Sequence, residues 1–103
     1  MADFMKILQQ AQEMQGRFQK LQEELQQQSV TATSGGGMVT VEANGQGTVR
    51  SIKIDPSVVN PADVEMLEDL LLVAVSEVQK KATEAAQAEM GKLTGGLPFK
   101  LPF

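Results

Sequence analysis

The sequence predicts an α+β domain with a long N-terminal helix, a three-stranded antiparallel sheet and a long C-terminal helix. Apolar residues recur at helical spacing near both ends of the chain, which is typical of amphipathic helices. Between them, short segments alternate apolar and polar residues and are separated by glycine-rich turns, which is typical of paired strands. The length of 103 residues, 42% of them apolar, is enough for one core and too short for a second.

The N-terminal segment carries apolar residues at alternating intervals of three and four. They are Phe4, Ile7, Ala11, Met14, Phe18, Leu21 and Leu25. This spacing predicts a helix with a coiled-coil-like seam, and the glutamine, glutamate and lysine residues between these positions favour a helix. The polar run 26–29 has no apolar anchor, so it predicts the end of the helix.

Residues 30–33, 38–43 and 48–54 are expected to form the strands. In the second segment Val39 and Val41 would point to one face of the sheet and the residues between them to the other. This alternation predicts a sheet that is buried on one face only.

The second and third strands are expected to form a hairpin. Asn44-Gly45 predicts the turn, because both residues adopt positive φ at low cost. In the third strand Val49 is out of phase with the two isoleucines that follow it. A β-bulge at Arg50 or Ser51 would restore the phase.

Three consecutive glycines, Gly35 to Gly37, stand ahead of the second strand. A phosphate-binding loop needs its glycines between a strand and a helix and usually closes with Gly-Lys-Ser or Gly-Lys-Thr. Here strand-like residues follow, so the run is interpreted as a strand-to-strand connection. An anion-binding nest of backbone amides is the alternative.

The second helix is predicted from about Pro61 to Lys92. Asn60 supplies an N-cap side chain, Pro61 suits the first helical position, and Asp63 places an acid in the first turn. Large apolar residues crowd the first half of this helix, which predicts burial on most sides. Past Gln79 the sequence still favours a helix but has few large apolar groups, so that half is expected to project into solvent.

Helix length predicts a homodimer. At 1.5 Å per residue the two helices would extend about 33 Å and about 48 Å, whereas a globule of this size has a radius of gyration of about 13 Å. A second copy would cover the apolar surface that a one-sided sheet and projecting helices leave open. Residues 1–92 are expected to form this single dimerising domain, and residues 93–103 a flexible tail. The predicted interface residues are Leu67, Leu70, Leu71, Val75 and Val78.

Composition argues against an enzyme. The chain has no cysteine and no histidine, which removes the thiolate nucleophile, the commonest general base and the commonest metal ligand. Glu65, Glu68 and Asp69 could hold a cation or do acid/base chemistry, but acids in a first helical turn ordinarily complement the helix dipole. No cofactor, metal or small-molecule substrate is expected.

No stretch approaches the roughly 20 apolar residues that span a bilayer, and the N-terminus lacks a secretory signal, so the expected location is the cytoplasm.

Five blocks follow one another over almost the whole chain: MKILQQAQEMQGRFQKLQEEL, GGGMVTVEANG, IKIDPSVV, EMLEDLLLVAV and LTGGL. Their order and spacing resemble the YbaB/EbfC family of bacterial nucleoid-associated DNA-binding proteins. The resemblance implies a tweezer-shaped homodimer with a central sheet and projecting helices that hold double-stranded DNA. It also implies a role in nucleoid organisation and gene expression. The last seven residues, LPFKLPF, depart from the Pro-Gly ending associated with the family, so the resemblance implies no role for them.

Contacts to DNA would have to be local, because the net charge is −4. The predicted DNA-binding residues are Lys6, Arg17 and Lys20 on the first helix and Lys80, Lys81 and Lys92 on the second. A dimer would double these cations, and they would contact phosphates with little base specificity. Arg50 and Lys53 rank lower, because a cation in the third strand is equally suited to pair with Glu42 across the hairpin.

A protein-interaction module is the alternative to a DNA-binding protein. The helical stripes contain methionines, whose flexible side chains repack around varied surfaces. A small acidic dimer of this kind could act as a chaperone or adaptor for a partner helix without binding DNA directly.

Overall fold

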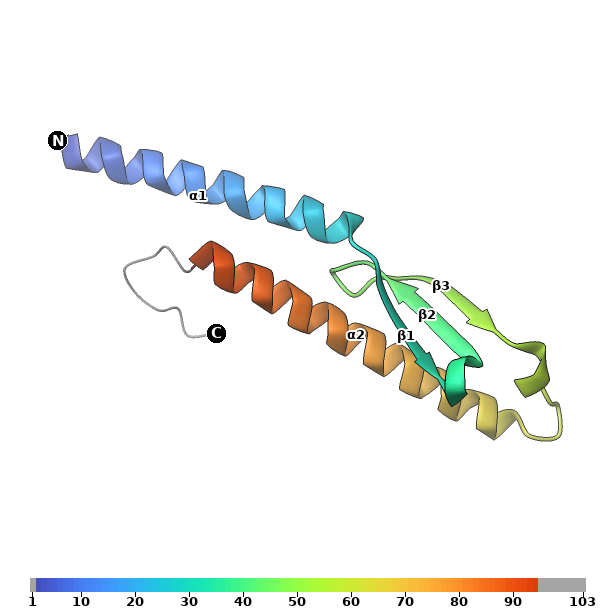
Figure 1. The fold of residues 1–103 in the computed structure, drawn as a ribbon. Coiled ribbons are helices and arrows are strands. Elements are labelled where there is room, and N and C mark those ends of the chain that lie inside the picture. Colours follow the sequence, from blue (N-terminus) through green and yellow to red (C-terminus); the bar gives the residue numbers. More distant parts are fainter. Residues whose placement is uncertain (1, 95–103) are drawn as a thin grey trace.

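The computed structural model describes residues 2–94 of the chain, an elongated body of 73 × 23 × 16 Å. Helix α1 (Ala2–Gln27) is followed by strands β1 (Val30–Ser34), β2 (Val39–Ala43) and β3 (Val49–Ile54) and by helix α2 (Val64–Thr94) (Figure 1). Short 3-10 turns, η1 (Gly35–Gly37) and η2 (Pro56–Val58), follow β1 and β3. The predicted class and order of elements are confirmed.

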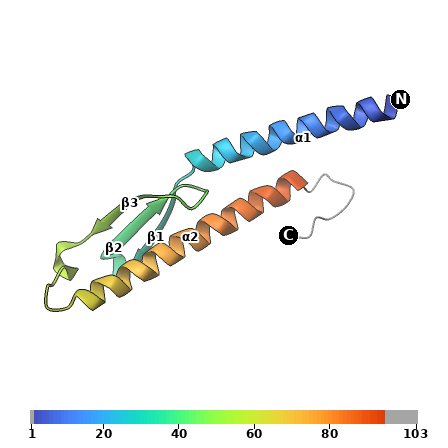
Figure 2. The same ribbon diagram turned by 180° about the vertical axis from the view of Figure 1, so that it is seen from behind.

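The three strands form one antiparallel sheet in the order β1-β2-β3, and α2 lies against β1 and β2 (Figures 1 and 2). The core lies between α2 and this face of the sheet. Val39 and Val41 of β2 are fully buried there against Ala74 and Val78 of α2. The one-sided burial predicted from the alternation in β2 is confirmed.

The predicted β-bulge is present at Arg50. Glu42 pairs with Ser51 and Ala43 pairs with Val49, so Arg50 is left without a partner in β2. The extra residue brings Val49 back onto the face that carries the other apolar residues of β3.

The β2–β3 hairpin is confirmed, but the predicted turn type is wrong. Positive φ occurs at Gly47 (89°), and neither Asn44 nor Gly45 adopts it. The buried Asn44 side chain shapes the turn, since its Oδ1 accepts hydrogen bonds from the amides of Gln46 (2.9 Å) and Thr48 (3.0 Å). These bonds stabilise a longer loop than the two-residue turn that an Asn-Gly pair favours.

The glycine run joins β1 to β2, which confirms the strand-to-strand interpretation. All three glycines have positive φ, at 61°, 68° and 96° for Gly35, Gly36 and Gly37. Such a succession of left-handed residues is accessible to glycine at little cost and strained for other residues. The chain therefore reverses direction between the strands within a few residues.

Helix α2 begins three residues later than predicted. The Oδ1 atom of Asp63 accepts the Met66 amide at 3.2 Å and so caps the helix, while the Oδ1 atom of Asn60 accepts the Ala62 amide in a preceding turn. Both side chains are suited to an N-cap position. In the folded chain Asp63 is the N-cap of α2, and Asn60 is not. The helix continues to Thr94, two residues into the tail predicted at 93–103. Residues 95–103 of that prediction lie outside the described residues.

Helix α1 extends away from the rest of the chain over most of its length (Figure 1). Leu21 and Leu25 in its last turns are buried, whereas Phe4 is 64% exposed and Ile7 63% exposed. Within the chain, the predicted apolar seam is therefore covered only at its C-terminal end.

Candidate nucleic-acid interface

The C-terminal half of α2 runs beside α1 beyond the end of the sheet, so the two helices extend in the same direction as a pair of arms (Figures 1 and 2). An open hollow lies between them. Its lining residues are Arg17, Lys20, Leu21 and Glu24 of α1 and Glu89, Lys92 and Leu93 of α2. Residues more than 60 positions apart in sequence thus form one surface.

Three of the six predicted DNA-binding residues, Arg17, Lys20 and Lys92, converge on this hollow. Arg17 and Lys20 lie one helical turn apart on α1, which places them on one face. Lys92 comes from the last turns of α2, where a cation also complements the helix dipole. The arrangement concentrates positive charge that is dispersed in the sequence.

Two carboxylates, Glu24 and Glu89, share the hollow with these cations. Lys92 Nζ lies 3.5 Å from Glu89 Oε1, and the lysine side chain is 77% exposed. An exposed pair of this kind contributes about 0–1 kcal/mol and is screened by salt. A phosphate can therefore replace the carboxylate as the partner of Lys92 at low cost.

The other three predicted cations lie outside the hollow. Lys6 is exposed near the start of α1, and Lys80 is exposed on α2. Lys81 Nζ donates a 3.1 Å hydrogen bond to the main-chain oxygen of Thr31, which directs it toward β1. Sequence reasoning treated Lys80 and Lys81 as equivalent neighbours, and the structure distinguishes them.

The Arg50 guanidinium donates a hydrogen bond to the main-chain oxygen of Gln26 at the end of α1. No ion pair joins it to Glu42 in the part of the chain that the structure describes. The bulge that leaves Arg50 unpaired in the sheet thus accompanies a contact that holds α1 to β3. Lys53 lies exposed on the same strand.

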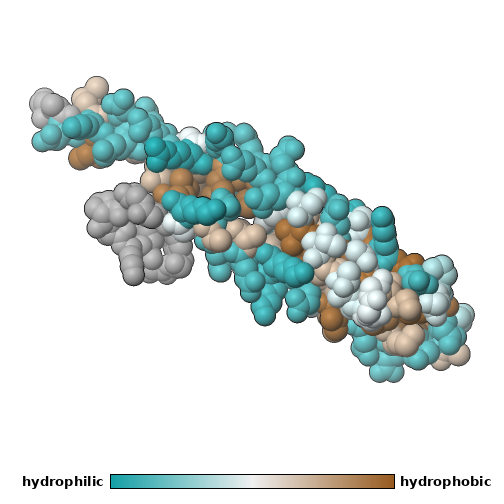
Figure 3. Space-filling model, in the orientation of Figure 1, coloured by the Kyte–Doolittle hydropathy of each residue, from teal (hydrophilic) through white to brown (hydrophobic). Residues whose placement is uncertain are grey.

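Hydrophilic residues cover most of α1 in the space-filling view, and apolar residues are visible at the other end of the molecule, near the start of α2 (Figure 3). Within residues 2–94, no helix combines the length and apolar character needed to cross a bilayer. The same residues contain no group of three or more acidic, cysteine or histidine side chains arranged to hold a metal ion.

Comparison with known proteins decides the family. The model of the YbaB/EbfC DNA-binding family matches residues 1–97. The chain belongs to the YbaB/EbfC DNA-binding family. The resemblance inferred from the order of the sequence blocks is confirmed.

Individual YbaB/EbfC relatives match over nearly their whole length. A nucleoid-associated protein of Gemmatimonas aurantiaca is 55% identical, with 98% of this chain and 99% of the relative covered. A nucleoid-associated protein of Thermodesulfovibrio yellowstonii is 59% identical, with 96% and 85% covered. The crystal structure of an uncharacterized Helicobacter pylori protein superposes with a TM-score of 0.81 at 28% identity, covering 89% of this chain and 97% of that one.

Proposed function

We propose that this YbaB/EbfC protein binds double-stranded DNA as a homodimer, with little sequence specificity, through cations on α1 and α2. The convergence of Arg17, Lys20 and Lys92 on one hollow between the arms carries the proposal. In the cell the protein would act in the cytoplasm on the nucleoid, affecting its organisation and gene expression. Its relatives named nucleoid-associated proteins support this setting.

The uneven distribution of charge reconciles DNA binding with a net charge of −4. Asp63, Glu65 and Asp69 lie at the start of α2, at the opposite end of that helix from Lys92. A duplex held by the arms would therefore keep away from the most acidic part of α2. With about four to six phosphates neutralised per dimer, log affinity should fall with log salt concentration with a slope of about −4 to −5.

Low sequence specificity follows from the chemistry of the arms. Their polar residues are mainly glutamine, glutamate and lysine, which contact phosphates without a fixed register in a groove. Aromatic residues are scarce, so stacking on bases contributes little.

The proposal of a homodimer rests on apolar surface that one protomer leaves open. Ile52 pairs with Val41 and Ile54 with Val39, so both isoleucines point to the face of the sheet that carries the core. Because α2 lies over β1 and β2, Ile52 remains 47% exposed and Ile54 37% exposed. Sequence reasoning missed these two residues as interface candidates. The signal was available, since one helix is too narrow to cover three strands.

The predicted interface residues of α2 differ in their accessibility. Leu67, Leu70, Leu71 and Val75 are half-buried against the core, and Val78 is fully buried beneath them in the protomer's own core. Gln79 donates a 3.5 Å hydrogen bond to the main-chain oxygen of Gly47, which marks the side of α2 that faces the β2–β3 hairpin. Val75 and Leu71 precede Gln79 by one and two turns on that side.

We therefore propose that a second protomer packs against one apolar strip, which we call the β3 strip. It consists of Ile52, Ile54, Leu71 and Val75. A dimer formed in this way would present two copies of the cationic hollow to DNA.

Fluorescence anisotropy of a labelled duplex, titrated with protein at several salt concentrations, tests DNA binding. Sedimentation equilibrium of the same samples measures the mass. The proposal predicts a dimer, similar affinities for unrelated duplexes and a steep salt dependence. A dimer that binds no duplex at low salt would support the adaptor alternative, and a monomer that binds DNA would refute the homodimer.

A further inference from the structure

We infer that an acid-rimmed apolar hollow at the start of α2 is a docking surface for a basic amphipathic peptide segment of a partner protein. The hollow has a volume of about 350 Å³ and is open to solvent. Its lining residues are Asp63, Glu65, Met66, Asp69, Leu70 and Val73. The inference goes beyond DNA binding, which concerns the other end of the helices.

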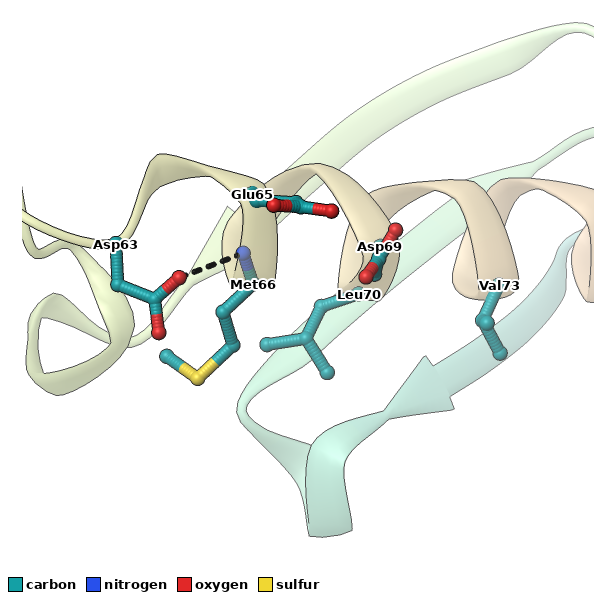
Figure 4. Close-up of a pocket in the computed structure, with 6 residues that line it drawn as sticks. All are labelled: Asp63, Glu65, Met66, Asp69, Leu70 and Val73. Carbon is teal, nitrogen blue, oxygen red and sulfur yellow. Dashed lines mark hydrogen bonds between the residues drawn. The ribbon is translucent and has the colours of Figure 1, made fainter.

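The floor of the hollow is apolar. Met66, Leu70 and Val73 follow one another at intervals of four and three, and Figure 4 shows their side chains projecting from the same side of α2. Met66 is 39% exposed and Val73 51% exposed. An open strip with this spacing matches the apolar face of an amphipathic helix, and the methionine can adapt to the side chains of a partner.

The floor is held in place from beneath. Ser34 Oγ donates a 2.7 Å hydrogen bond to the main-chain oxygen of Leu70. A Cβ at Gly35 would lie 2.9 Å from Leu70 Cδ2, so the leucine side chain packs closely on the glycine turn. Leu70, in the middle of the floor, is therefore fixed against β1 and η1.

The rim of the hollow is acidic and has no basic partner. Glu65 and Asp69 are four residues apart, and in Figure 4 the Glu65 side chain extends along the helix toward Asp69. Like charges at this spacing destabilise a helix by about 0.2–0.5 kcal/mol. Neither carboxylate forms an ion pair within residues 2–94. A cationic side chain from a partner would relieve this repulsion.

The surrounding sequence strengthens the charge complementarity. Residues 54–79 contain no lysine or arginine and include the acids Asp55, Asp63, Glu65, Glu68, Asp69 and Glu77. Such a surface repels phosphate and attracts basic peptides. The hollow would thus stay free while the arms hold DNA.

The hollow and the β3 strip lie on different flanks of α2. Leu70 is anchored to Ser34 on the β1 side, whereas Gln79 marks the side toward the β2–β3 hairpin. Leu70 is the single residue that the hollow shares with the predicted dimer interface, and its backbone and side chain are engaged by β1 and η1. Dimerisation through the β3 strip would leave Glu65, Met66 and Val73 accessible.

The test uses the full-length protein and a labelled peptide of about 14 residues, built from leucine and lysine with leucine at helical spacing. Fluorescence anisotropy measures its affinity for the wild type, for Glu65→Gln/Asp69→Asn and for Met66→Gln/Val73→Thr. The control is Glu13→Gln/Glu84→Gln, which removes two exposed acids elsewhere and gives the same net charge. Each of the two hollow variants should bind about fivefold more weakly or worse, and the control should bind like the wild type.

Equal weakening by the control and the charge variant would mean that only net charge attracts the peptide, which would overturn the inference. Failure of the wild-type protein to bind the peptide would also overturn the inference. Sedimentation equilibrium adds an independent readout, because dissociation of the dimer by the hollow variants would assign this surface to a second copy. Failure of DNA binding alone would refute the proposed function and leave the docking surface standing.

Discussion

The main-chain amide of Gly45 donates a 2.7 Å hydrogen bond to the main-chain oxygen of Leu25. This bond joins the β2–β3 hairpin to the last turns of α1, where Leu25 itself is buried. Arg50 reinforces the junction through its bond to Gln26. The direction of the first arm is therefore set by the hairpin.

Gly45→Ala should weaken this junction. An added Cβ would lie 2.8 Å from the Leu25 oxygen and 2.8 Å from Gln28 Oε1, so the hairpin and helix would have to separate. We expect a loss of about 2 kcal/mol in the free energy of unfolding, measured by urea denaturation. A variant as stable as the wild type would show that the junction adapts without strain.

Gly16→Ala provides the opposite case. Gly16 is inside α1, and nothing lies within 4 Å of the position that a Cβ would occupy. Alanine should stabilise the helix by up to about 1 kcal/mol, which a rise in helicity by circular dichroism and in the urea midpoint would reveal. Destabilisation would instead indicate a contact with a second copy at this site.

Lys92→Gln tests the hollow between the arms. The exchange removes one charge per protomer and two per dimer, so the slope of log affinity against log salt should become shallower by about 2. Lys53→Gln is the matched control, because it removes an exposed lysine on β3, away from the arms. Identical salt slopes for the two variants would exclude the hollow as a phosphate contact.

Ile52→Thr/Ile54→Thr tests the β3 strip. Threonine retains β propensity and removes apolar area that one protomer leaves partly open. Dimer dissociation should shift to an about tenfold higher concentration or more in sedimentation equilibrium. Val73→Thr is the control, since Val73 is 51% exposed and lies on the other flank of α2, in the hollow that also contains Met66 and Leu70. An unchanged dissociation midpoint would move the interface elsewhere.

Asp55 should make stability depend on acid pH. The Ser57 amide donates a 2.9 Å hydrogen bond to Asp55 Oδ1 and, with the Ser57 side chain, holds the pKa of this carboxyl below its usual range. The stabilisation is therefore present at neutral pH and is lost as the pH falls through the folded-state pKa. At neutral pH the free energy of unfolding should be larger for the wild type than for Asp55→Asn. Urea denaturation at decreasing pH should show that this difference becomes smaller. A difference that is constant with pH would contradict the role of the charge.

Local chemistry was sufficient to predict the elements. Helical spacing located both helices, alternation located the sheet, and the phase error at Val49 predicted the bulge at Arg50. These features depend on neighbours within a few residues, and they can be worked out from one sequence. The choice between Asn60 and Asp63 as the N-cap of α2 could not be predicted from the sequence, because both side chains are suited to capping a helix N-terminus.

The sequence by itself therefore determined the type and order of the helices and strands, the one-sided sheet and the family. Only the tertiary structure decided which cations converge, since Lys92 meets Arg17 and Lys20 through the relative direction of two helices. It also decided that Lys81 donates a hydrogen bond to the main-chain oxygen of Thr31, and that α2 covers β1 and β2 and leaves β3 uncovered. The physical reason is that contacts between distant segments depend on how the elements pack, and the Gly45–Leu25 junction that directs α1 leaves no periodic signal in the sequence.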